Sequence, residues 1–398
     1  MSLSDTAGSR GAPAGFGLVL FALLVMMAGA SAPSPFYPVL QQEFGFSPVA
    51  MTGIFAVYAV TLLITLLCTG SLSDHLGRRP VLSGAFALLS VSILIFWQAG
   101  GTGTLLLARA LQGVASGLLL STLSAAAVDL EPKGRPGLAA IATSVVPLGG
   151  LALGSLAAGL VLDFAGHPEA DVFGCLVFLY LALAGLIWFA DETSPRHGGV
   201  LASLRPHVAI PARARGAFWR SAPAVFAGWA TGGLYLSLGA PLVEHVFGVA
   251  DKLVQAVIIS ILAAAGAGAC FAARGATARA VTLYGTTALA LGTALTLVGV
   301  ALASLPFYAV AVAIAGTGFG TCFYGVMRSI IPLAQEDERG GLFAALFTLS
   351  YTAFGVPVVL AGLLVPHAGL GATFLGYGGV IVLFAAAAGL WRRFGTRE

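Results

Sequence analysis

Arg109 and two further polar side chains form a stripe inside a long apolar run, residues 103–129. Gln112 and Ser116 follow Arg109 by three and seven residues, so a helix would present all three on one face. A guanidinium binds anions and carbonyl oxygens, and a polar stripe beside it can hold a substrate or relay a proton. Because a charge inside an apolar layer is costly, we expect these residues to handle substrate or protons. The alternatives are hydrogen bonds to backbone carbonyls that hold helices together, or a guanidinium that reaches the membrane surface.

Carboxylates are missing from the interior of the first apolar runs. No Asp or Glu lies in the middle of the first six apolar runs. A cavity that holds a cation and no carboxylate favours neutral or anionic substrates. Proton coupling then has no obvious carrier. We expect the nearest titratable groups to be solvated loop residues: Glu43, Asp163, Glu244 and His245.

Other kinds of chemistry find little support in the residues. The histidines are scattered and mostly in predicted loops, and each of the 4 cysteines stands alone in an apolar run. There is no metal-ligand spacing, no glycine-rich phosphate loop and no nucleophile–base pair. We therefore expect no metal, no cofactor and no enzymatic activity, with a proton gradient as the energy source.

The composition shows where the chain resides. Of its 398 residues 58% are hydrophobic and only 9% are charged, against about 25% in a soluble domain. The mean hydropathy is +0.97. These values exclude a soluble fold, a disordered chain and a nucleic-acid-binding domain, because a water-exposed surface needs many more charges.

Apolar runs between polar or Pro/Gly breaks predict an all-α integral membrane protein with twelve transmembrane helices, since a span needs about 20 residues. The expected spans are 15–35, 48–70, 80–99, 103–129, 137–162, 172–190, 219–244, 253–273, 280–303, 306–331, 341–365 and 370–391. An Ala30-Ser31-Ala32 sequence in the first span resembles a signal-peptidase site, but Pro33 disfavours cleavage.

Charge orients these spans. With both termini cytoplasmic, 17 of the 19 Lys and Arg residues fall on the cytoplasmic side. Lys252 alone falls on the other side, and Arg109 lies within a span. This distribution follows the positive-inside rule and indicates an inner or plasma membrane protein.

The two halves of the chain resemble each other. Arg135 and Arg339 begin similar segments 204 residues apart, and Gly159 and Gly362 begin a second pair 203 residues apart. Internal repeats in a helical membrane protein are typical of transporters with alternating access. We expect a cytoplasmic tail, a six-helix bundle, a cytoplasmic linker, a second six-helix bundle and a second tail, at residues 1–14, 15–190, 191–218, 219–391 and 392–398.

A loop motif identifies a family. After the second expected span the chain reads Gly70-Ser-Leu72-Ser-Asp74-His-Leu-Gly77-Arg78-Arg79-Pro-Val-Leu82. This segment resembles, position by position, motif A of the major facilitator superfamily, G-x-L-x-D-x-x-G-R-[KR]-x-x-L. The resemblance implies two six-helix bundles related by pseudo-two-fold symmetry.

Motif A implies a conformational latch. Gly77 permits a tight turn in a short loop. The resemblance implies that Asp74 meets the positive end of the eleventh helix near Gly341 when the outside is open, and that Arg78 then pairs with Asp129. The alternative is that Arg78 and Arg79 only mark the topology.

Two weaker motifs extend the resemblance. Residues 105–113, with Arg109, Gln112 and Gly113, match motif B. Residues 150–159 resemble the antiporter motif C, except that Ser155 replaces its proline and Ala158 one glycine. We expect this segment to serve helix packing and gating through Pro147, Gly150, Gly154 and Gly159.

Aromatic residues are candidates for a cavity lining, because Tyr and Trp combine an apolar body with a polar group. The same residue types also mark the membrane interface, which is the alternative. The candidates are Tyr58, Trp229, Tyr235, Tyr324, Tyr351 and Phe354.

These features predict a secondary active transporter that exports a small organic molecule by alternating access, by proton antiport. The alternative is an uptake symporter or facilitator for a small neutral or anionic metabolite. A third hypothesis is a membrane sensor that binds a soluble partner through residues 191–220. We expect a monomer in the lipid bilayer with a small-molecule substrate and no nucleic acid partner.

Overall fold

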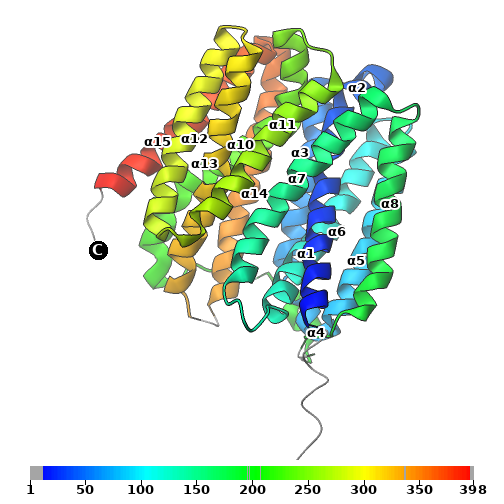
Figure 1. The fold of residues 1–398 in the computed structure, drawn as a ribbon, viewed down its shortest axis with the longest axis vertical. Coiled ribbons are helices and arrows are strands. Elements are labelled where there is room, and N and C mark those ends of the chain that lie inside the picture. The colour runs from blue at the N-terminus through cyan, green and yellow to red at the C-terminus, as the bar shows by residue number, and fades with distance from the viewer. Residues whose placement is uncertain (1–11, 195, 197, 207, 336–337, 395–398) are drawn as a thin grey trace, which may run out of the picture.

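The computed structural model describes residues 12–194, 196, 198–206, 208–335 and 338–394. The described part is helical and has no strands, which confirms the all-α fold class. The expected tails at 1–14 and 392–398 lie largely outside the described residues. We call the side at which α1 (Ala12–Ser31) begins, at the bottom of Figure 1, the termini end, and the opposite side the far end.

The first half of the chain forms a bundle of six long helices, which contact one another through pairs such as α3 with α6 and α1 with α7. We call it the N-terminal bundle. Its helices are α1 (Ala12–Ser31), α3 (Pro48–Thr69), α5 (Arg78–Trp97), α6 (Thr102–Asp129), α7 (Leu138–Phe164) and α8 (Pro168–Leu186).

The second half forms the C-terminal bundle, in which α12 packs against α13 and α15 against both α10 and α12. Its helices are α10 (Ala212–Phe247), α11 (Lys252–Ala272), α12 (Ala278–Ala301), α13 (Leu305–Ile330), α14 (Arg339–Ala368) and α15 (Leu370–Phe394). Short helices lie between the long ones: α2 (Tyr37–Phe44), α4 (Leu72–Leu76) and α9 (Val200–Ser203).

Eleven helices in the described residues are long and apolar enough to span a membrane. The twelfth, α10, has 36 residues, more than a bilayer requires. It is less apolar because its buried face carries small and polar residues, among them Thr231, Gly232, Gly233, Tyr235 and Ser237. Small residues let α10 approach its neighbours closely, so its composition reflects contact with protein rather than lipid.

Two pairs of helices join the bundles, α3 with α14 and α7 with α11. In each pair the second helix of one bundle meets the fifth helix of the other. The two joints are therefore equivalent under the pseudo-two-fold relation that the sequence repeat predicts.

Most helix boundaries lie within four residues of the expected ones, and two of the differences have a cause that the sequence shows. α10 begins at Ala212, inside the segment expected as a linker up to residue 218. Pro211 precedes the helix, and the Ala- and Arg-rich segment that follows has high helix propensity. α1 ends at Ser31 and is followed by a 3-10 turn, Ser34–Phe36, and by α2. Pro33 and Pro35 keep α1 from continuing because proline lacks the backbone donor that a continuing helix requires, whereas Pro38 lies in the first turn of α2.

Candidate functional site

Arg109 lies inside the N-terminal bundle with only 1% of its surface exposed. Its guanidinium donates a short hydrogen bond to the side-chain oxygen of Gln112. Gln112 in turn donates to the carbonyl of Gly29 on α1, at 2.9 Å. The alternative that Arg109 reaches the membrane surface is therefore wrong, because its own neighbours enclose it. Among the described residues no carboxylate pairs with it.

Aromatic rings lie against the Arg109 guanidinium. Its central carbon is 4.4 Å from the ring centre of Tyr58 and 5.9 Å from that of Phe55, both on α3. Ser116 lies against Tyr58. α3 and α6 approach closely because Gly113 faces the backbone of Tyr58, where a side chain would collide. The polar stripe predicted on α6 is thus folded onto the aromatic face of α3.

Phe55 connects this site to the C-terminal bundle through a ring contact. Its ring centre is 5.0 Å from that of Phe354 on α14. The ring centre of Phe354 is 6.0 Å from that of Trp229 on α10, and the ring centre of Trp229 is 4.8 Å from that of Tyr351. We call this group the interbundle cluster: Arg109, Phe55, Tyr58, Trp229, Tyr351 and Phe354. It joins both bundles through side chains near the middle of their helices.

Two of the expected lining residues lie elsewhere. Tyr235 is fully buried within the C-terminal bundle, where it packs against Tyr308 and Phe374. Tyr324 lies under the guanidinium of Arg328, toward the termini end of α13. The sequence could not distinguish Tyr235 and Tyr324 from Tyr351, because tyrosine occurs both in the packed core of a bundle and at positions between the bundles.

Sequence reasoning missed Phe55, Tyr37 and Tyr180. The buried hydroxyls of Tyr37 and Tyr180 and the Nε of Arg109 have no hydrogen-bond partner among the described residues. Arg109 acts electrostatically on both Tyr37 and Tyr58. Unpartnered buried polar atoms are rare in folded proteins and call for an explanation at each site. Tyr37 lies within the group of prolines that follows α1, between Pro35 and Pro38, and this was the signal that the sequence offered.

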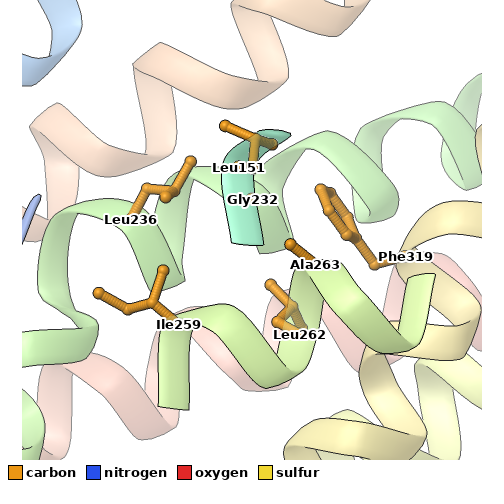
Figure 2. A pocket seen from close by; sticks show the side chains of 7 residues that line it. All are labelled: Leu151, Gly232, Leu236, Ile259, Leu262, Ala263 and Phe319. Carbon is orange, nitrogen blue, oxygen red and sulfur yellow. The ribbon is translucent and has the colours of Figure 1, made fainter. Parts of the chain in front are cut away.

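A small apolar pocket lies beside this region, between the bundles. Figure 2 shows Leu151 of α7 facing residues of three C-terminal helices. These residues are Gly232, Leu236, Ile259, Leu262, Ala263 and Phe319. The pocket places apolar surface from both bundles at one mid-membrane position.

The bundles are joined at the far end by Asp163, the penultimate residue of α7. Its carboxylate accepts hydrogen bonds from the backbone nitrogens of Lys252 at 3.3 Å and Leu253 at 2.6 Å, in the first turn of α11. Nearby, Glu244 accepts from Lys252 at 3.0 Å and from Gln42 of the other bundle at 3.4 Å. The expectation that Asp163 and Glu244 are merely solvated is wrong, because they hydrogen-bond across the interface.

The segment that resembles motif C packs on two partners. Gly150 and Gly154 face the backbone of α1, where a side chain would meet Ala28. Gly159 faces Ala256 of α11 across the interface. Between them the hydroxyls of Ser155 and Ser260 lie 2.8 Å apart. Pro147 lies inside α7, on the side of these contacts nearer the termini end.

The motif A residues gather at the termini end. Gly70 ends α3, and Gly77, at φ 108°, makes the turn into α5. The Arg78 guanidinium lies 2.5 Å from Asp74 and 3.3 Å from Asp129 at the end of α6. The expected contact of Arg78 with Asp129 is present. The backbone carbonyl of Asp74 accepts from the Ser194 hydroxyl, and that of Gly341 on α14 accepts from Ala209 of the linker, so the contact of Asp74 with α14 stays a prediction.

Glu192 completes this assembly and was not predicted. Its carboxylate accepts from the backbone nitrogens of Arg78 at 2.8 Å and Arg79 at 3.2 Å, and so caps α5. Burial alone would raise the pKa of Glu192. Backbone donors from Arg78, Ser194 and Arg79, together with the Arg196 guanidinium, outweigh burial and lower that pKa. A side chain at Gly77 would meet the Glu192 carboxylate at 2.8 Å, so Gly77 also makes room for this cap.

Comparison with known proteins agrees with this architecture. Residues 19–356 match the model of the Major Facilitator Superfamily. The human organic anion transporter MFSD10 has a similar structure, with a TM-score of 0.71 over 96% of this chain and 100% of that one, at 16% identity.

Two relatives in Escherichia coli (strain K12) match part of the chain. The inner membrane transport protein YnfM is 32% identical over 174 residues, which is 43% of this chain and 39% of YnfM. MdtD, provisionally assigned as a multidrug resistance protein, is 26% identical over 176 residues, 44% of this chain and 37% of MdtD. The chain thus spans less than half the length of the curated relatives that it matches.

Proposed function

The chain belongs to the major facilitator superfamily, and we propose that it is a secondary active transporter that exports a small anionic or neutral organic molecule. It is a multi-pass membrane protein. In our proposal it resides in an inner or plasma membrane with both termini cytoplasmic, as a monomer without a cofactor.

The interbundle cluster carries this proposal. A transporter couples substrate to movement only if the substrate contacts the parts that move, and this cluster has members in both bundles. Arg109 supplies a buried positive charge without a carboxylate partner among the described residues. Aromatic rings supply apolar surface for an organic molecule. Together they favour a neutral or anionic substrate over a lipophilic cation.

The orientation follows from charge. Arg78, Arg213 and Arg392 lie at the termini end, whereas Lys252 lies at the far end. The positive-inside rule then makes the termini end cytoplasmic. On that orientation, the hydrogen bonds of Asp163 and Glu244 hold the outer side of the interface together. Alternating access requires these bonds to break when the outer side opens.

Export and proton antiport rest on narrower support. The segment around Gly150 and Gly154 resembles the motif of antiporters, and one relative, MdtD, bears a multidrug resistance name. Uptake by symport is the competing direction.

The test uses the full chain in proteoliposomes with an imposed proton gradient. The probes are carboxyfluorescein as an organic anion and ethidium as a lipophilic cation. We expect gradient-driven movement of carboxyfluorescein in the export direction, slowed about tenfold or more in Arg109→Gln and less in Arg109→Lys. Preferential ethidium export would overturn the substrate class. Movement in the opposite direction would favour uptake, and binding of a soluble partner without any transport would favour a sensor.

A further inference from the structure

Three arginines from three helices meet at the termini end of the C-terminal bundle. They are Arg220 on α10, Arg279 on α12 and Arg392 on α15. α15 packs against both other helices (Figure 1), and the charges of Arg279 and Arg220 both act on Arg392. The Arg279 guanidinium also donates to the backbone carbonyl of Arg392, at 3.5 Å. We call these three residues the arginine triad.

The triad lacks the counter-charges that other arginines at this end have. Arg78 pairs with Asp129, and Arg213 pairs with Glu338 at 3.0 Å. In the described ranges, by contrast, no ion pair joins any member of the triad to a carboxylate. Three like charges repel one another, so an anion bound among them would relieve that repulsion.

Within the part of the chain that the structure describes, most hydrogen-bond donors of the triad have no protein acceptor. Arg392 donates to the hydroxyl of Ser329 on α13 at 2.5 Å, and Arg220 donates to the carbonyl of Gly216 at 3.1 Å. Each of these bonds uses one of the five N–H groups of a guanidinium. Guanidinium groups bind phosphate oxygens in pairs, with charge on both partners.

Two tryptophans indicate the depth in the membrane at which the triad lies. Trp219 precedes Arg220 and is 61% exposed, and Trp391 precedes Arg392 and is 53% exposed. Exposed tryptophans on membrane helices mark the boundary between hydrocarbon and headgroups. The triad therefore lies at the level of the phospholipid phosphates rather than in bulk water or in hydrocarbon.

We propose that Arg220, Arg279 and Arg392 form a binding site for the headgroup phosphate of an anionic phospholipid. Basic pockets between membrane helices hold such headgroups, and the interfacial depth selects lipid over a soluble anion. The site is separate from the interbundle cluster and does not depend on which substrate is transported.

Native mass spectrometry of the full chain tests this site. The protein is presented with equal amounts of phosphatidylglycerol and phosphatidylcholine, and bound lipids are counted. We expect selective retention of phosphatidylglycerol. Each arginine contributes about fivefold to the affinity for an anionic membrane surface. Arg392→Gln should therefore weaken phosphatidylglycerol binding about fivefold, and replacing all three arginines by Gln about a hundredfold.

A matched control changes the same net charge at the same end. It replaces Arg205, Arg215 and Arg274 by Gln, all of which are exposed and lie outside the triad. We expect this variant to keep selective retention. Equal loss in both triple variants would overturn the proposal in favour of diffuse attraction. If the triad variant does not fold, Arg279→Gln, a change at an exposed position, provides the same comparison.

Inorganic phosphate separates the two possible sources of the anion. Thermal unfolding of the protein in phosphatidylcholine nanodiscs is measured with added phosphate and, separately, with phosphatidylglycerol in the bilayer. A ligand that binds only the folded state raises the Tm. We expect phosphatidylglycerol to raise the Tm through the triad and phosphate to leave it unchanged. A triad-dependent rise with phosphate alone would overturn the lipid assignment.

Discussion

The carboxylate of Asp163, on α7, lies 2.6 Å from the backbone nitrogen of Leu253, on α11. A side chain of one bundle therefore caps a helix of the other. The same helix is also capped from within its own bundle by Asp251, which accepts from Val254 at 2.8 Å. A negative charge at a helix N-terminus is stabilised by the helix dipole and the free N–H groups. Separating the bundles at the far end removes one cap and leaves the other.

The first prediction concerns this interbundle cap. Asp163→Ala should favour separation of the far ends of α7 and α11 by about 1 kcal/mol, or about fivefold in population. Pulsed electron paramagnetic resonance between spin labels at those two ends measures the distance distribution. Asp251→Ala is the control, because it weakens the same helix end without touching the interface. Equal broadening in both variants would show that the interbundle bond has no special role.

The second prediction concerns the two glycines at the repeated joints. A side chain at Gly159 would collide with Ala256, and one at Gly362 with Thr52. Gly159→Ala and Gly362→Ala should each weaken the joint by about 1–3 kcal/mol through overpacking. Spin labels at the far ends of α7 and α11 should report separation in Gly159→Ala. Labels at the far ends of α3 and α14 should report separation in Gly362→Ala. Gly84→Ala on α5, where open space surrounds the glycine, should leave the distances unchanged.

The third prediction concerns pH and the linker cap. Because the pKa of Glu192 is lowered in the folded protein, its carboxylate stabilises the fold above its ordinary value of 4.5. That contribution disappears as the pH falls through the lower, folded-state value. Glu192→Gln should lower the free energy of unfolding by about 1 kcal/mol at neutral pH, and wild type and variant should converge in acid.

Thermal unfolding of wild type and Glu192→Gln at several pH values measures whether their stabilities converge in acid. Asp191→Asn, at the exposed neighbouring position, is the control and should follow wild type throughout. A gap between Glu192→Gln and wild type that stays constant into acid would contradict the capping role.

The fourth prediction separates ring from hydroxyl at Tyr58. The Arg109 guanidinium lies over the ring at 4.4 Å, so Tyr58→Phe should keep the contact and Tyr58→Leu should lose about 1–2 kcal/mol. Thermal unfolding without substrate reports this loss. A double-mutant cycle with Arg109→Gln isolates the pair. A coupling free energy near zero between Arg109 and Tyr58 would contradict a stabilising contact between them.

The fold could be predicted largely from the sequence. Composition required lipid contact, and the apolar runs matched the long helices to within four residues at each end, except at the start of α10. A spanning helix satisfies its own backbone hydrogen bonds, so local sequence decides where it forms. The Arg78–Asp129 contact could be inferred from motif A, because a family pattern already encodes a distant pair.

The functional sites depended on tertiary packing. The sequence determined that Arg109 is a charge inside a membrane helix, and the fold decided that Tyr58 and Phe55 cover it. The sequence could not pair Asp163 with Leu253, because their hydrogen bond joins a side chain to a backbone nitrogen 90 residues away, and backbone groups leave no mark on residue type. Periodicity shows which side of a helix is polar, whereas which neighbour meets that side is set by how twelve helices pack.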